Sequence, residues 1–156
     1  MRRWMRHTGS WKDCSNSTRP LVVRWNGIYL KTECWFMDER IQFIEHRGKS
    51  IMVIDFSGLS GEQIIPLVDE VQRSLAHAPA NSALTLADFT GSHVDKTAAT
   101  RMKEALTLDR PHVKRSAWVG VESLPKVFYE NFKNFSQRDF PTFKTREEAM
   151  EWLVGE

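Results

Sequence analysis

Three short apolar runs, at residues 51–56, 83–88 and 116–121, are separated by longer segments whose apolar residues recur at helical spacing. Each run has the length of a strand and is apolar enough to be covered on both faces of a sheet. Parallel strands need a crossover connection, and a helix usually makes it. This alternation therefore predicts an α/β fold with a largely parallel sheet.

Two further strands complete the predicted sheet. Residues 41–46 form a β-rich run that the turn-like residues 47–50 join to the 51–56 run, which indicates a hairpin. Residues 140–143 predict a short fifth strand. The order β-β-α-β-α-β-α-β-α predicts a mixed, mostly parallel five-stranded sheet with four helices and right-handed crossovers.

Capping residues and apolar periodicity predict the four helices. Ser60 and Thr145 are each followed three residues later by Gln or Glu, the spacing of a capping box. Asp95 and Ser123 are the expected N-caps of the second and third helices. The expected apolar faces, helix by helix, are Ile64, Val68, Val71 and Leu75; Ala98, Met102, Ala105 and Leu106; Leu124, Val127, Phe128, Phe132 and Phe135; and Ala149, Trp152 and Leu153.

Charge, cysteine and tryptophan content all change near Met37. Residues 1–36 carry seven basic and two acidic side chains, both cysteines and four of the six tryptophans, whereas the rest carries 15 basic and 18 acidic side chains. We therefore expect residues 1–36 to be a basic, tryptophan-containing extension that need not be ordered, and residues 37–156 to be one domain. The extension fits an arm for RNA or a membrane surface, or one without a function, and residues 22–30 could add an edge strand.

Several classes of protein are disfavoured by composition. The slightly acidic domain argues against a nucleic-acid-binding surface, which needs a basic stripe. No apolar run is long enough for a transmembrane helix, and the two cysteines match no zinc or redox spacing, so we expect a cytoplasmic protein. The five histidines lack metal-ligand spacing and no glycine-rich phosphate loop is present, so we expect neither a metal nor a cofactor.

Four stretches of sequence resemble the SpoIIAA-like family of small bacterial proteins. They are IDFSGL (54–59), LTLADFTG (84–91), KRSAWVGV (114–121) and AMEWL (149–153). The element order is similar to that of STAS domains, the fold of bacterial anti-sigma factor antagonists, and the family is described as lying between STAS domains and the CRAL-TRIO lipid-binding fold. The resemblance covers roughly residues 40–154 and implies a SpoIIAA/STAS-like fold with a regulatory or signalling role.

The resemblance departs from the anti-sigma factor antagonists at one loop. Those proteins carry a phosphorylatable serine in an Asp-Ser-Ser-Gly-like loop, where this chain has Asp88-Phe89-Thr90-Gly91-Ser92. Thr90 and Ser92 lie near the corresponding position, but the motif is absent. A phosphorylation switch is therefore not carried over.

The candidate site lies where the parallel strands end, the usual place for a site in an open α/β sheet. The polar residues expected there are Asp55, Asp88, Thr90, Ser92, His93 and Ser123. Ser92 with His93 would suit a hydrolase, whereas the plainer reading is that these residues cap helices and loops. We predict no catalytic residue, and a site for a protein partner or a small anionic ligand.

An aromatic stripe gives an alternative function. Phe128 and Phe132 follow one another at helical spacing, with Phe135, Phe140 and Phe143 nearby. This is the pattern of an ordinary core, but it also suits a groove for a lipophilic molecule, which would make the protein a carrier, or a homodimer face.

A basic run lies at the opposite edge of the predicted sheet, before the fourth strand. It contains Arg110, His112, Lys114 and Arg115. Basic side chains beside a turn are ordinarily solvated, so this run receives no function from the sequence.

Overall fold

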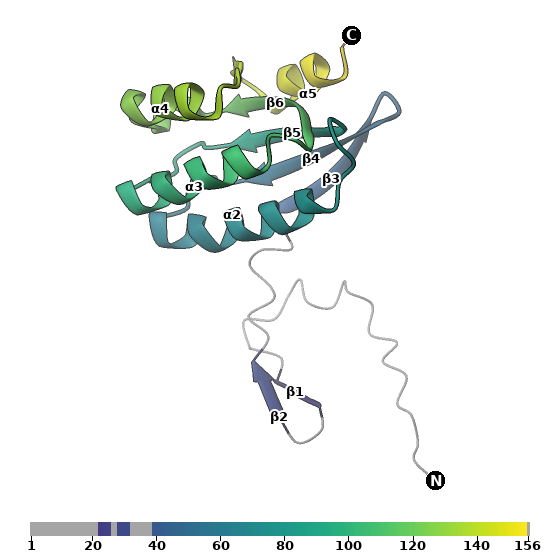
Figure 1. Ribbon diagram of the computed structural model, residues 1–156, viewed down its shortest axis with the longest axis vertical. Coiled ribbons are helices and arrows are strands. Elements are labelled where there is room, and N and C mark those ends of the chain that lie inside the picture. Colours follow the sequence, from purple (N-terminus) through teal and green to yellow (C-terminus); the bar gives the residue numbers. More distant parts are fainter. Residues whose placement is uncertain (1–21, 26–27, 32–38, 156) are drawn as a thin grey trace. The chain divides into compact units, whose positions relative to one another are not determined.

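Five strands form one sheet in the order in which they occur along the chain (Figure 1). The computed structural model describes residues 22–25, 28–31 and 39–155. The strands are β3 (Ile41–His46), β4 (Lys49–Asp55), β5 (Ala83–Asp88), β6 (Val113–Val119) and β7 (Thr142–Phe143). β3 pairs with β4 in antiparallel orientation, and every later pair is parallel. The predicted mixed, mostly parallel sheet is confirmed.

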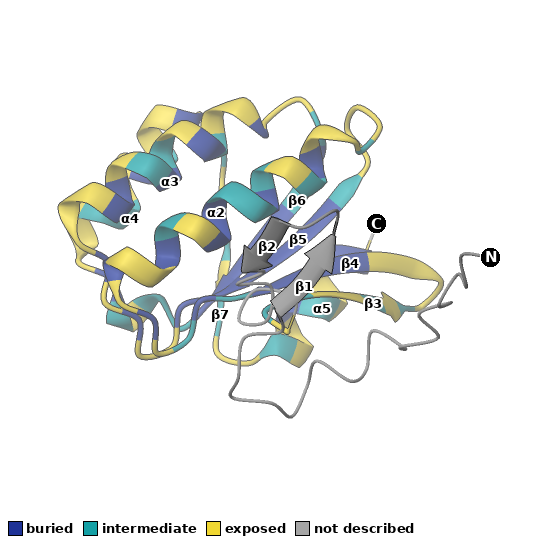
Figure 2. Ribbon diagram, turned by 90° about the horizontal axis from the view of Figure 1, so that it is seen from below, coloured by how far each residue is buried: buried dark blue, intermediate teal, exposed yellow. Residues whose placement is uncertain are grey.

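The helices cover the two faces of the sheet unequally. They are α2 (Gly61–Ala76), α3 (Lys96–Leu108), α4 (Lys126–Ser136) and α5 (Arg146–Val154). Helices α2, α3 and α4 each connect two neighbouring parallel strands. Because right-handed crossovers that step in one direction place their helices on one side, these three share a face. Helix α5 follows the last strand and covers the other face (Figure 2).

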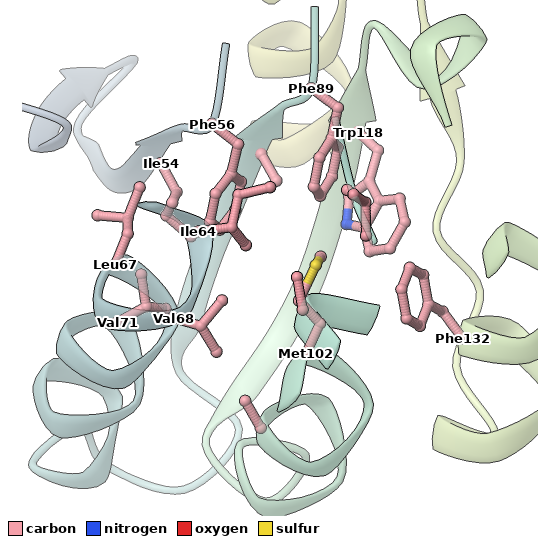
Figure 3. Close-up of a cluster of buried hydrophobic side chains, with 14 of the residues drawn as sticks. Ile54, Phe56, Ile64, Leu67, Val68, Val71, Phe89, Met102, Trp118 and Phe132 are labelled. Atoms are coloured by element: carbon pink, nitrogen blue, oxygen red, sulfur yellow. The ribbon is translucent and has the colours of Figure 1, made fainter. Parts of the chain in front are cut away.

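The larger core lies between the sheet and helices α2 to α4. The sheet and its loops contribute Ile54, Phe56, Phe89 and Trp118, all buried. The side chains that meet them from the helices include Ile64, Leu67, Val68, Val71, Met102 and Phe132 (Figure 3). Alternate residues of β4 point to opposite faces, so Ile51 belongs to the smaller core under α5, as predicted for a strand covered on both sides.

The third helix begins later than expected. Ser123 was the predicted N-cap, but it lies in a 3₁₀ turn (Val121–Ser123), and the helix starts at Lys126 after Pro125. The Ser123 hydroxyl instead accepts the Gly91 N–H at 2.7 Å. A serine oxygen satisfies whichever orphan amide lies nearest, and here that amide belongs to another loop.

Strand bounds and apolar faces also differ in part from the prediction. β6 begins three residues before the predicted 116–121 run, and β7 has only two residues. Val127 and Phe135 are 60% and 51% exposed, and Trp152 is 37% exposed. Helices α4 and α5 therefore bury a narrower stripe than the periodicity suggests.

Residues before Arg40 belong to a separate unit of the chain. In it, β1 (Val22–Trp25) and β2 (Ile28–Lys31) form an antiparallel two-stranded sheet of their own, where the sequence predicts a single strand over residues 22–30. The rest of the predicted extension lies outside the described residues. None of the helices in the described part of the chain is long and apolar enough to cross a membrane.

A truncated protein that starts at Met37 is expected to fold alone with a single cooperative transition. All strands of the main sheet and their helices lie between Ile41 and Val154. Urea denaturation followed by both circular dichroism and tryptophan fluorescence tests this. Non-coincident transitions or an insoluble product would show that residues 1–36 complete the fold.

Candidate functional site at the carboxyl edge of the sheet

Two neighbouring strands end in nearly the same four residues. Asp55-Phe56-Ser57-Gly58 follows β4 and Asp88-Phe89-Thr90-Gly91 follows β5, with Asp55 and Asp88 as direct partners in the sheet. The Phe56 and Phe89 rings stack with centroids 5.0 Å apart. Gly58 and Gly91 have φ values of +66° and +67°, a conformation that favours glycine. The repeat is visible in the sequence as two copies of Asp-Phe-Ser/Thr-Gly, and it is the signal from which the paired turns could be predicted.

Each aspartate closes its own turn. Asp55 Oδ1 accepts the Ser57 N–H at 2.9 Å and the Ser57 hydroxyl. Asp88 Oδ1 accepts the Thr90 N–H at 2.9 Å and the Thr90 hydroxyl at 2.6 Å. The Gly58 N–H also donates to the Thr90 carbonyl at 3.0 Å. Two Asx turns are therefore fixed to each other at the edge of the sheet.

A third loop packs against these turns. Gly120 follows β6 with a φ of +70°, and a Cβ there would overlap the backbone of Thr90. Ser123, which comes soon after, accepts the Gly91 N–H. The loops after β4, β5 and β6 thus form one surface.

Arg146 joins the two aspartates. Its Nε donates to Asp88 Oδ2 at 2.7 Å, and its Nη2 lies 3.2 Å from Asp55 Oδ2. On the other side, Arg40 Nη1 donates to the carbonyls of Ser57 (2.8 Å) and Asp55 (3.1 Å). Neither arginine was a predicted site residue. One sequence signal existed, because an arginine in the first turn of a helix is disfavoured by the helix dipole and so suggests another role.

The surroundings of Asp55 and Asp88 lower the pKa of both carboxyl groups. Burial alone would raise the pKa of each carboxyl, but hydrogen bonds from Ser57 or Thr90 and the charge of Arg146 lower it below the ordinary value of 3.8. In turn, Asp88 and Asp55 raise the pKa of Arg146 against the effect of its own burial. Both carboxylates are therefore charged at neutral pH and act as acceptors, which suits positioning of the loops rather than proton transfer.

Comparisons with known proteins establish the fold. No family model and no curated protein matches the sequence. Among solved structures, the chain is similar to an uncharacterised DUF3478-family protein from Shewanella loihica PV-4, which is described as having a SpoIIAA-like fold. The TM-score is 0.59 at 18% identity, over 73% of this chain and 92% of that one. The domain has a SpoIIAA-like fold. The predicted resemblance is thus confirmed for the fold.

The SpoIIAA-like domain does not bring Ser92 and His93 together. Ser92 is 1% exposed, and its hydroxyl has no hydrogen-bond partner within residues 39–155. His93 is exposed, and its N–H donates to the Leu59 carbonyl at 2.8 Å. The nucleophile and base that a serine hydrolase needs are therefore not hydrogen-bonded to each other. Thr90 of the same loop is exposed, and its hydroxyl donates to Asp88.

The aromatic stripe belongs to the core of the SpoIIAA-like domain. Phe132 is buried, with its ring 5.8 Å from that of Trp118, and Phe128 packs against the same cluster. The cavity beside Trp118 has a volume of about 60 Å³. That volume holds about two water molecules, whereas pockets for drug-sized ligands are roughly 300–1,000 Å³. The geometry therefore gives the lipophilic carrier no support.

Replacing Arg146 with Met is expected to raise the pKa of both aspartates and to destabilise the domain by about 1 kcal/mol at pH 7, a small value because Arg146 is partly solvated. A pKa that is lower in the folded than in the unfolded state stabilises above the unfolded value, and that contribution is lost as the pH falls. The difference between the wild type and Arg146→Met should therefore shrink below about pH 4. Carboxyl ¹³C NMR titration and urea denaturation measure both effects.

The matched control is Arg73→Met, which removes an exposed arginine that pairs with Glu70 on α2. It should leave the pKa values of Asp55 and Asp88 unchanged. Equal effects of the two substitutions would mean that Arg146 does not organise the two turns.

Proposed function

We propose that the SpoIIAA-like domain is a non-catalytic regulatory module that binds a protein partner through the surface formed by residues 57–60, 90–93 and 120–123. The observation that carries the proposal is the doubled Asx turn, bridged by Arg146. Because internal hydrogen bonds hold both turns, the surface would lose little conformational entropy on binding. Gly58, Ser60, Thr90, Gly91 and His93 are all exposed on it.

The hydrogen bonds of this surface favour a protein over a small anion. The amides of residues 57–60 and 90–93 all donate within the protein, to side-chain or main-chain oxygens. A small anion would need free N–H groups here, as at the helix N-termini that bind phosphate. A protein partner can instead use the exposed hydroxyls and carbonyl groups together with shape complementarity.

Site-specific photo-crosslinking tests the proposal. A benzophenone amino acid replaces His93 in the full chain, and the protein is irradiated in the cells that naturally make it. We expect a discrete protein adduct that is lost when Thr90→Arg is added, because a long charged side chain would block the surface. The same crosslinker at Glu104, exposed on α3, is the control.

Three results would count against this surface. They are no adduct from position 93, an equal adduct from position 104, or an adduct that Thr90→Arg leaves unchanged. Circular dichroism of each purified variant establishes that it is folded. A lost adduct in a folded variant then reports on binding.

A further inference from the structure

Two adjoining hollows lie at the amino end of β6, far along the strands from the turns described above. One, of about 270 Å³, is lined by Arg110, Lys114, Arg115 and Arg138. The other, of about 530 Å³, is lined by Lys49, Lys114 and Arg115. The two share Lys114 and Arg115 in their walls, so they adjoin at these residues, and together they are called the basic depression.

The basic side chains around the smaller hollow form no direct ion pairs within residues 39–155. Arg110, Lys114 and Arg138 are unpaired in this sense, although Arg40, Arg47, Arg73, Arg101 and Arg146 all form ion pairs. Arg138 does interact electrostatically with one acidic group, the buried carboxyl of Asp109. The one acidic residue of the lining, Asp139, lies 3.5 Å from Lys133. The domain as a whole has more acidic than basic residues, so composition does not explain this local excess of positive charge.

Neutral groups hold two of the arginines in place. Arg138 Nη2 donates to Ser116 Oγ at 2.6 Å, and that hydroxyl lies 2.7 Å from Thr85 Oγ1. Arg110 Nη1 donates to Gln137 Oε1 at 3.2 Å. Each guanidinium has further N–H groups beyond this one bond. By contrast, Arg115 donates to two carbonyls at the carboxyl end of α5, those of Trp152 and of the C-cap residue Gly155.

The backbone of β6 is uncovered where Ser116 lines the same hollow. The Trp118 N–H points towards β7, where it donates to the Pro141 carbonyl at 3.0 Å, whereas the Val119 carbonyl faces β5. Successive N–H groups of a strand alternate between its two edges, so the Ser116 N–H points to the same edge as that of Trp118. β7 pairs with β6 only at Trp118 and Val119, so no strand covers Ser116 on that side.

We propose that this depression binds an organic phosphate, with its phosphate group in the smaller hollow held by Arg110, Lys114, Arg138 and the Ser116 N–H. A phosphate monoester offers two negative charges and several acceptor oxygens to three cations and an amide, and arginine binds phosphate with a matching pair of N–H groups. The larger hollow leaves room for the rest of the molecule. This depression is separate from the proposed partner-binding surface, so the experiments test the two proposals independently.

Calorimetric titration of the full chain with pyrophosphate and with ribose 5-phosphate tests the proposal. The exposed Lys114 and Arg110 are replaced singly by Ala, and Lys126→Ala is the control because Lys126 is exposed at the start of α4 and lines neither hollow. We expect each of the first two substitutions to weaken binding about tenfold, the usual effect of losing a charge-assisted contact, and the control to leave it unchanged. Thermal denaturation establishes that all variants fold.

The basic residues of segment 1–36 are the same in every variant, so they affect all titrations equally. Binding that no substitution weakens would place the anion elsewhere and overturn the proposal. If Lys126→Ala weakens binding as much as the other two substitutions, the anion responds only to the overall charge of the protein, and the proposed site is wrong. Tighter binding of a single-stranded oligonucleotide, of polyglutamate or of phosphatidic acid vesicles, with the same dependence on Lys114, would assign the depression to that ligand instead.

Discussion

Trp118→Ala is expected to lower the free energy of unfolding by about 3–5 kcal/mol, the usual cost of removing a large buried aromatic side chain. Trp118 is 3% exposed on β6, between β5 and β7, and its ring contacts those of Phe89 and Phe140 at centroid distances of 4.9 and 4.4 Å. Phe132 and Tyr129 pack against it edge-on. Because the surrounding rings belong to three different segments, namely the loop after β5, helix α4 and the loop before β7, they cannot all move to fill the cavity left behind. Urea denaturation followed by circular dichroism measures the loss.

The matched control is Trp152→Ala on α5. Trp152 is 37% exposed, with Arg115 and Phe143 as its ring neighbours. Its replacement should cost about 1 kcal/mol, since less apolar area leaves contact with the protein. A loss below about 1 kcal/mol for Trp118→Ala would contradict the packing of this face of β6 in the larger core, under helices α2 to α4.

Asp109→Asn is expected to stabilise the domain above pH 6 and to remove part of its pH dependence. Asp109 is 5% exposed at the carboxyl end of α3, and burial raises the pKa of its carboxyl to about 6, against the opposing charges of Arg138, His112 and Arg101. A negative charge at that end of a helix also opposes the helix dipole.

The raised pKa of Asp109 determines how the stability of the domain changes with pH. A carboxyl whose pKa is higher in the folded than in the unfolded state binds its proton more tightly when folded, so stability is greatest below the unfolded value of 3.8 and falls as the pH rises through about 6. The loss approaches roughly 2–3 kcal/mol above that pH. Asparagine has a similar shape and no charge, so the variant avoids this loss.

Urea denaturation of the wild type and Asp109→Asn between pH 4.5 and 8 measures the effect. The stability difference should grow with pH in favour of the variant, while Asp139→Asn, which changes a carboxylate that is 92% exposed, should show no such trend. A difference that stays constant across this range would mean that the Asp109 carboxyl titrates normally.

The order of strands and helices was determined by the sequence alone. Apolar runs with strand length and apolar residues at helical spacing report local backbone geometry, which needs no knowledge of distant contacts. β5 has the predicted bounds, Ala83–Asp88, and α3 starts directly after its predicted N-cap, Asp95. The parallel order of the strands also places Asp55 and Asp88 at one edge, because residues that end adjacent parallel strands are neighbours.

The partners of those aspartates were decided only by the tertiary structure. Arg146 reaches Asp55 and Asp88 because α5 starts at the carboxyl edge on the face that the other helices leave uncovered, and periodicity does not encode that crossing. The same holds for Ser123, whose hydroxyl meets Gly91 instead of its own helix. Arg110 and Lys114 line a hollow because β7 is too short to cover the start of β6. Side-chain pattern predicts an element and its buried face, but the contacts between elements depend on where each one ends and how it crosses its neighbours.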